Sequence, residues 1–106
     1  MTDLELIITL DGWNEKSPGL YWRLEKCETG TLLEFKKANE FKYDDIESLQ
    51  RVLDKFNALV NLNEALEIEA LIYNDLLSET KIYMDKKDVQ YAFQSLLKLI
   101  KTFITL

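Results

Sequence analysis

Residues 20–37 read LYWRLEKCETGTLLEFKK, two apolar-polar alternating runs separated by a short Glu-Thr-Gly turn. Successive side chains of a strand point to opposite faces, so alternation of this kind is typical of half-buried strands. A glycine turn between two such runs is typical of a β-hairpin. The pattern predicts strands at 19–27 and 31–37 with one covered face. The side chains expected on that inward face are Leu20, Trp22, Leu24, Leu33 and Phe35.

Upstream of the hairpin, residues 4–10 also alternate. Leu4, Leu6, Ile8 and Leu10 fall on one side of an extended chain. Asp11-Gly12 and the turn-forming residues 14–19 then interrupt the pattern. We therefore expect a third strand at 4–10, which would make the N-terminal part an antiparallel three-stranded meander.

The remainder of the sequence has helical periodicity. Asp44 and Glu47 have the spacing of a capping box, and apolar residues then recur every three or four positions, which predicts a helix at 45–60. The same signals predict a helix at 86–104. The residues of the two apolar stripes are Ile46, Leu49, Leu53, Phe56 and Val60 in the first, and Val89, Phe93, Leu96, Ile100 and Phe103 in the second.

Residues 62–77 fit two periods. Leu66, Ile68, Ala70 and Ile72 alternate as in a strand, whereas Leu62, Leu66, Ala70, Tyr73 and Leu77 share one helical face. The segment is rich in Leu, Ala and Glu, and this composition favours a helix. We expect a single domain over 1–106 of the α+β class. It would be an N-terminal three-stranded antiparallel β-meander packed against two or three C-terminal α-helices.

The distribution of charge singles out the same segment. Residues 56–80 carry five carboxylates and no Lys or Arg, in a chain whose formal net charge is −6. On a helix, four of these carboxylates would share the outward face with two branched apolar side chains, a mixture found at binding sites. The candidate partner-binding residues are Glu64, Glu67, Ile68, Leu71, Asp75 and Glu79. If the segment were a strand, Ile68 would turn inward; the carboxylates could also be merely solvated.

Several classes of function are disfavoured by composition. The chain has no histidine and a single cysteine, Cys27, so a Ser-His-Asp triad, a His-based metal site and an intrachain disulfide cannot form. Its three glycines are isolated, which rules out a phosphate-binding loop. We therefore expect no enzyme activity, no metal and no cofactor. The negative charge argues against direct nucleic-acid binding. The acidic start and the lack of a long apolar run predict a cytoplasmic protein without a membrane segment.

A one-signed patch steers a partner of opposite charge. The function expected from these residues is that of a small acidic inhibitor that binds a basic protein. An immunity protein would work in this way, by occluding the active site or substrate groove of a nuclease-type bacterial toxin. A phage-type anti-restriction or anti-CRISPR inhibitor is an alternative. A structural or homo-oligomeric subunit without catalytic activity is another.

Overall fold

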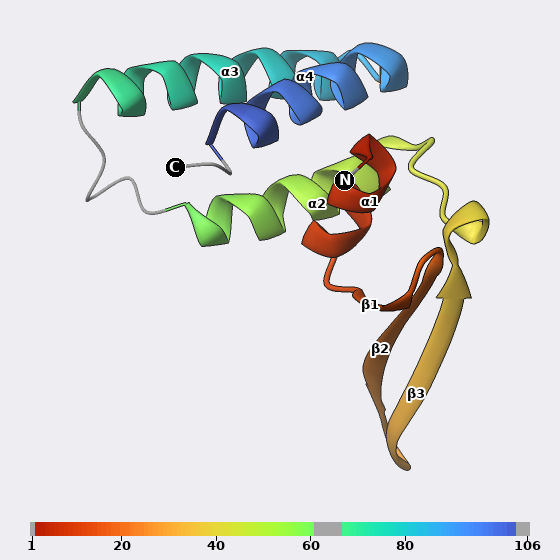
Figure 1. Cartoon of the computed structure of the whole chain (residues 1–106). Coiled ribbons are helices and arrows are strands. Elements are labelled where there is room, and N and C mark those ends of the chain that lie inside the picture. Colours follow the sequence, from red (N-terminus) through yellow and green to blue (C-terminus); the bar gives the residue numbers. More distant parts are fainter. Residues whose placement is uncertain (1, 61–66, 104–106) are drawn as a thin grey trace. The chain divides into compact units, whose positions relative to one another are not determined.

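A computed structural model describes residues 2–60 and 67–103 (Figure 1). A three-stranded antiparallel sheet is followed by three helices, which confirms the predicted α+β class. The chain divides into two compact units, Met1–Lys42 and Tyr43–Leu106. The elements are α1 (Asp3–Leu10), β1 (Asn14–Ser17), β2 (Leu20–Cys27), β3 (Gly30–Lys37), the short 3₁₀ helix η1 (Ala38–Glu40), α2 (Ile46–Leu59), α3 (Glu67–Asp85) and α4 (Val89–Phe103).

In the first unit, the strands follow one another in the order β1-β2-β3. β2 and β3 form a long hairpin over their whole length, with Trp22 opposite Phe35 and Leu24 opposite Leu33 (Figure 1). This confirms the strands predicted at 19–27 and 31–37. The short β1 pairs with the beginning of β2, where Asn14 lies opposite Trp22.

The strand predicted at 4–10 is wrong, because these residues form the helix α1. Thr2 and Glu5 make a reciprocal capping box, in which each side chain accepts a hydrogen bond from the other residue's backbone N–H. This cap satisfies N–H groups that would otherwise lack partners in the first turn. Ile7 and Ile8 are both fully buried, and neighbours in a strand would point to opposite faces. The third strand is instead β1, whose polar, exposed residues gave no alternating signal.

The predicted orientation of the hairpin is also wrong. Leu24, Leu33 and Phe35, which were expected to face inward, are 47–62% exposed. The opposite face is covered at the end of the hairpin where Tyr21 is buried and its ring lies 5.7 Å from that of Phe41, whereas Leu32 on the same face is 58% exposed. Trp13 meets Phe41 edge-on at 4.9 Å and completes this aromatic cluster. Alternation distinguishes the two faces of a strand but does not show which of them is buried.

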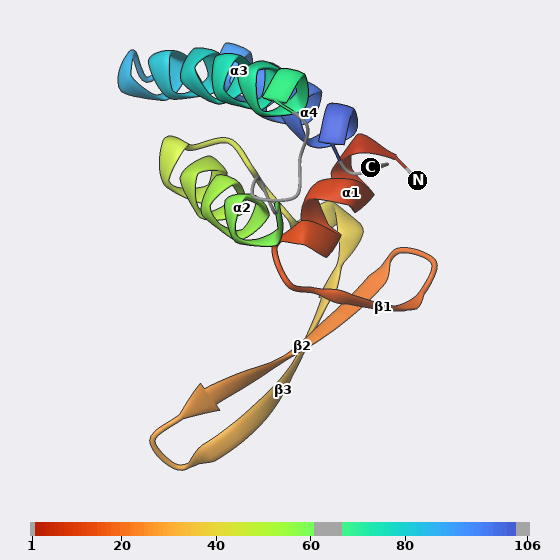
Figure 2. The ribbon, with the colours of Figure 1, turned by 90° about the vertical axis from the view of Figure 1, so that its left-hand side faces the viewer.

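The second unit consists of α2, α3 and α4. α4 packs against both of the other helices, and Figure 2 shows it lying alongside α3. The helix predicted at 45–60 is confirmed as α2, and the one predicted at 86–104 is confirmed as α4, which begins later, at Val89; its predicted end at 104 lies outside the described residues. The cap of α2 is Asp45, one residue later than predicted, and its carboxylate accepts the backbone N–H of Ser48 at 2.7 Å.

α3 confirms that the ambiguous segment is helical, as far as residues 67–77 are concerned. The predicted start at 62 lies outside the described residues. The helix continues beyond the predicted end at 77 as far as Asp85. Lys87 then adopts a left-handed conformation, with φ of 58°. The backbone N–H of Lys87 donates a hydrogen bond to the carbonyl of Met84, and the N–H of Asp88 donates to the carbonyl of Tyr83. This pair of hydrogen bonds is the Schellman motif that ends a helix. Asp88 begins α4 by accepting the N–H of Tyr91 at 3.3 Å.

Among the described helices, none has the length and apolar character needed to cross a membrane.

Candidate protein interface

One face of α3 is fixed against its neighbours. Its buried residues are Tyr73, Leu76, Thr80 and Met84, which recur every three or four positions and therefore lie on one side of the helix. The Thr80 hydroxyl donates to the carbonyl of Leu76 at 2.9 Å, so this buried polar group is satisfied within the helix. The burial of this stripe determines which residues of α3 face outward.

Aromatic contacts hold α3 in this rotation at both ends. Near its start, Tyr73 meets the ring of Phe103 edge-on at 5.2 Å and lies 6.5 Å from that of Phe56. The Tyr73 hydroxyl donates to the side-chain oxygen of Asn57, and loss of solvation raises the pKa of this tyrosine. Near its end, Tyr83 stacks on Tyr91 of α4 with ring centres 5.4 Å apart. These contacts therefore fix the orientation of α3 and of its outward face.

The outward side combines aliphatic and acidic side chains. Four large aliphatic residues are 45–71% exposed there, although α3 has a separate buried stripe. Two exposed carboxylates, Asp75 and Glu79, stand between them, and Glu67 lies at the edge. We call this surface the α3 face. Its residues are Glu67, Ile68, Leu71, Ile72, Asp75, Glu79 and Ile82.

The sequence predicted most of this surface. Glu67, Ile68, Leu71, Asp75 and Glu79 are all exposed on α3, as expected for a helix, while Glu64 lies outside the described residues. Ile72 and Ile82 also lie on this face and were not among the predicted residues. Ile82 could have been predicted if the helix had been continued beyond residue 77. Successive residues of an α-helix are about 100° apart, so Ile82 points within about 20° of the direction of Asp75.

The carboxylates of the α3 face lack ion-pair partners among the described residues. Within residues 2–60 and 67–103, no salt bridge engages Asp75 or Glu79. These two carboxylates are four residues apart on the helix, a spacing at which like charges repel by a few tenths of a kcal/mol. A partner that brings positive charge to this face would relieve the repulsion.

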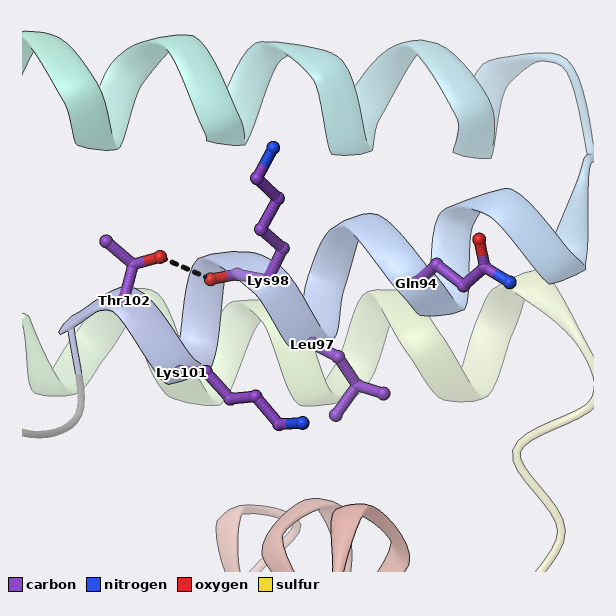
Figure 3. A pocket seen from close by; sticks show the side chains of 5 residues that line it. All are labelled: Gln94, Leu97, Lys98, Lys101 and Thr102. Carbon is purple, nitrogen blue, oxygen red and sulfur yellow. Dashed lines mark hydrogen bonds between the residues drawn. The ribbon is translucent and has the colours of Figure 1, made fainter.

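A hollow of about 450 Å³ on α4 is a much weaker candidate (Figure 3). Gln94, Leu97, Lys98, Lys101 and Thr102 line it, and all of them belong to one helix. The side chains of Lys98 and Lys101 point in opposite directions in Figure 3, so their charges do not converge. Thr102 donates to the carbonyl of Lys98 at 2.7 Å within the helix. The hollow therefore lacks the convergent polar groups of a catalytic or ligand-binding site.

No metal-binding cluster of Cys, Asp and Glu occurs in the part of the chain that the structure describes. Neither a family model, nor a curated protein, nor a solved structure matches this chain.

Proposed function

We propose that this protein acts by binding, and that the α3 face docks on a basic protein partner. The partner class that fits best is a nuclease-type toxin domain, which the chain would inhibit as an immunity protein does, by covering the active site or substrate groove. The observation that carries the proposal is the row of exposed aliphatic side chains with Asp75 and Glu79 between them.

The aliphatic side chains would supply most of the affinity. Ile68, Leu71, Ile72 and Ile82 each keep about half or more of their surface in water. Burying the exposed part of one such side chain contributes on the order of 1 kcal/mol, before the costs of association. Three of them cluster between Ile68 and Ile72, and Ile82 lies ten residues farther along the helix, about 15 Å away, beyond Asp75 and Glu79.

The carboxylates would increase the rate of association and the selectivity for a basic partner. A nuclease holds nucleic acid through lysines and arginines that neutralise phosphates. Asp75 and Glu79 can take the place of phosphates in such a groove, and their field would accelerate encounter with it. This role needs no catalytic group on the chain itself. The single thiol, Cys27, is exposed and free, which suits the reducing cytoplasm proposed as its compartment.

The test compares two variants of equal net charge. The α3 variant, Asp75→Lys with Glu79→Lys, reverses two carboxylates of the α3 face. The control, Glu40→Lys with Asp44→Lys, reverses two exposed carboxylates elsewhere. Each tagged protein is recovered from its native cells at low and moderate salt, and the purified partner is then assayed for nuclease activity.

The expected result is a basic nuclease that co-purifies with the wild type and the control, and that both of them inhibit. The α3 variant should bind it at least about tenfold more weakly, since two attractive charges become repulsive. Equal inhibition by the α3 variant would show that another surface binds the partner.

A further inference from the structure

The β2–β3 hairpin carries a second uncovered apolar face. Residues directly opposite each other in the ladder share one side, so the Trp22–Phe35 and Leu24–Leu33 pairs lie together. Leu24, Leu33 and Phe35 are about half exposed or more, whereas on the other side the rings of Trp13, Tyr21 and Phe41 pack together at one end of the hairpin.

All the charges on this second face are positive. Lys26 follows Leu24 by two positions and Lys37 follows Phe35 by two, so both lysines project on the same side. The ammonium of Lys16 lies 4.8 Å from the centre of the Phe35 ring. We call this surface the hairpin face. Its residues are Lys16, Trp22, Leu24, Lys26, Leu33, Phe35 and Lys37.

The carboxylates of the two strands lie on the other side. Glu34 pairs with Arg23 at 3.1 Å, and the Arg23 guanidinium stacks 4.5 Å from the centre of the Trp13 ring. Glu25 lies opposite Leu32, again on the side away from Leu24. The hairpin face thus resembles the α3 face in its apolar centre and has the opposite sign of charge.

We infer that the hairpin face of one copy docks on the α3 face of a second copy. The inference rests on the α3 face named in the proposed function, and it adds a second occupant for that face. Three lysines face three carboxylates, Glu67, Asp75 and Glu79. The lengths also agree, since the hairpin face from Lys37, which lies opposite Leu20, to Lys26 spans about 20 Å of strand and the helix from Ile68 to Ile82 spans about 21 Å.

This contact joins two different surfaces, so it is heterologous. A single strip of this size falls among small interfaces, which bury less than about 1,200 Å² in total and bind weakly. Self-association therefore covers the α3 face only at high protein concentration. A partner with a stronger basic groove displaces the second copy, because both compete for the same carboxylates.

Sedimentation velocity at low salt, from about 10 µM to about 1 mM protein, measures the association in the weak range expected for so small a contact. The hairpin variant is Lys26→Glu with Lys37→Glu, and the α3 variant is Asp75→Lys with Glu79→Lys. Each alone should associate at least about tenfold more weakly than the wild type, because like charges then face each other. The two variants mixed should recover a one-to-one complex, since one keeps a native α3 face and the other a native hairpin face.

A control with Lys42→Glu and Lys98→Glu has the same net charge as the hairpin variant and changes exposed lysines outside the hairpin face. It should associate like the wild type. Circular dichroism verifies that each variant is folded. The inference is overturned if the wild type stays monomeric throughout, or if the mixture sediments like the separate variants. Co-sedimentation of a monomeric wild type with vesicles of anionic phospholipid would assign the hairpin face to a membrane surface instead.

Failure of this inference can be told apart from failure of the proposed function. The hairpin variant keeps the α3 face intact and should still bind and inhibit the basic nuclease. If the hairpin variant inhibits the nuclease, while neither the wild type nor any mixture self-associates, the proposed function is supported and the contact between copies is refuted. If self-association follows the expected pattern but the α3 variant still inhibits the nuclease, the contact between copies is supported and the proposed role of the α3 face in inhibition is refuted.

Discussion

The outward orientation of α3 makes a quantitative prediction about two leucines of the same helix. Leu71 is 64% exposed, whereas Leu76 is 8% exposed and belongs to the buried stripe. Leu71→Ala and Leu76→Ala are the same chemical change in the same element, so helix propensity contributes equally to both. Any difference in the free energy of unfolding reports the environment of the side chain.

The two costs should differ severalfold. Truncating a buried leucine to alanine removes buried methyl groups and leaves a cavity, which costs about 2–5 kcal/mol. Leu71 has only about a third of its surface in contact with protein, so its truncation should cost less than about 1 kcal/mol. The higher helix propensity of alanine offsets part of that.

Urea unfolding followed by circular dichroism at 222 nm measures the difference, because α2, α3 and α4 contribute most of the helix. Tryptophan fluorescence is the internal control, since Trp13 and Trp22 both lie in the first unit. Equal losses for the two variants would refute the assignment of Leu71 to an exposed face. A protein concentration near 1 µM keeps self-association from protecting Leu71.

Three further predictions concern the support of α3 and the cap of α2. Hydrogen bonds from the backbone and side chain of Ser48 lower the pKa of Asp45 in the folded state. The ionised carboxylate therefore stabilises the fold fully above its unfolded pKa of about 3.9. This contribution is lost as the pH falls through the lower pKa of the folded state. Asp45→Asn should keep the cap and flatten acid unfolding below about pH 4, whereas Asp45→Ala should lower the melting temperature at neutral pH. Tyr73→Phe removes the donor to Asn57 and should cost about 0.5–1.5 kcal/mol in urea unfolding. Lys87→Gly should stabilise the protein by about 0.5–1 kcal/mol in the same assay, because glycine adopts the left-handed conformation without strain.

The helical part of the fold was predictable because its signals are local. Apolar residues such as Leu49, Phe56, Leu96 and Ile100 recur at helical spacing, and all four are buried. The five described residues of the predicted binding site lie on one exposed face because the same spacing determines both sides of a helix. In the second unit, the extension of α3 beyond residue 77 was not predicted, since the short stretch 80–84 holds too few residues to show a helical period.

The N-terminal errors have a different origin. Residues 4–10 alternate, yet Ile7 and Ile8 also fit a helix, and the Thr2–Glu5 capping box decides between the two. In the hairpin, both faces are partly apolar, and the choice depends on the distant rings of Trp13 and Phe41 gathering around Tyr21. Such long-range packing cannot be predicted from the alternation of apolar and polar residues along a strand.

The Schellman turn at Lys87 also bears on the order of folding. Only three residues join α3 to α4, so Tyr83 and Tyr91 meet across a sequence separation of eight. Contacts of such short range close at little entropic cost, and helical hairpins built from them form fast. We expect the α3–α4 pair to assemble early and α2 to join it afterwards. The surface that would bind a partner is therefore carried by an early-forming part of the molecule.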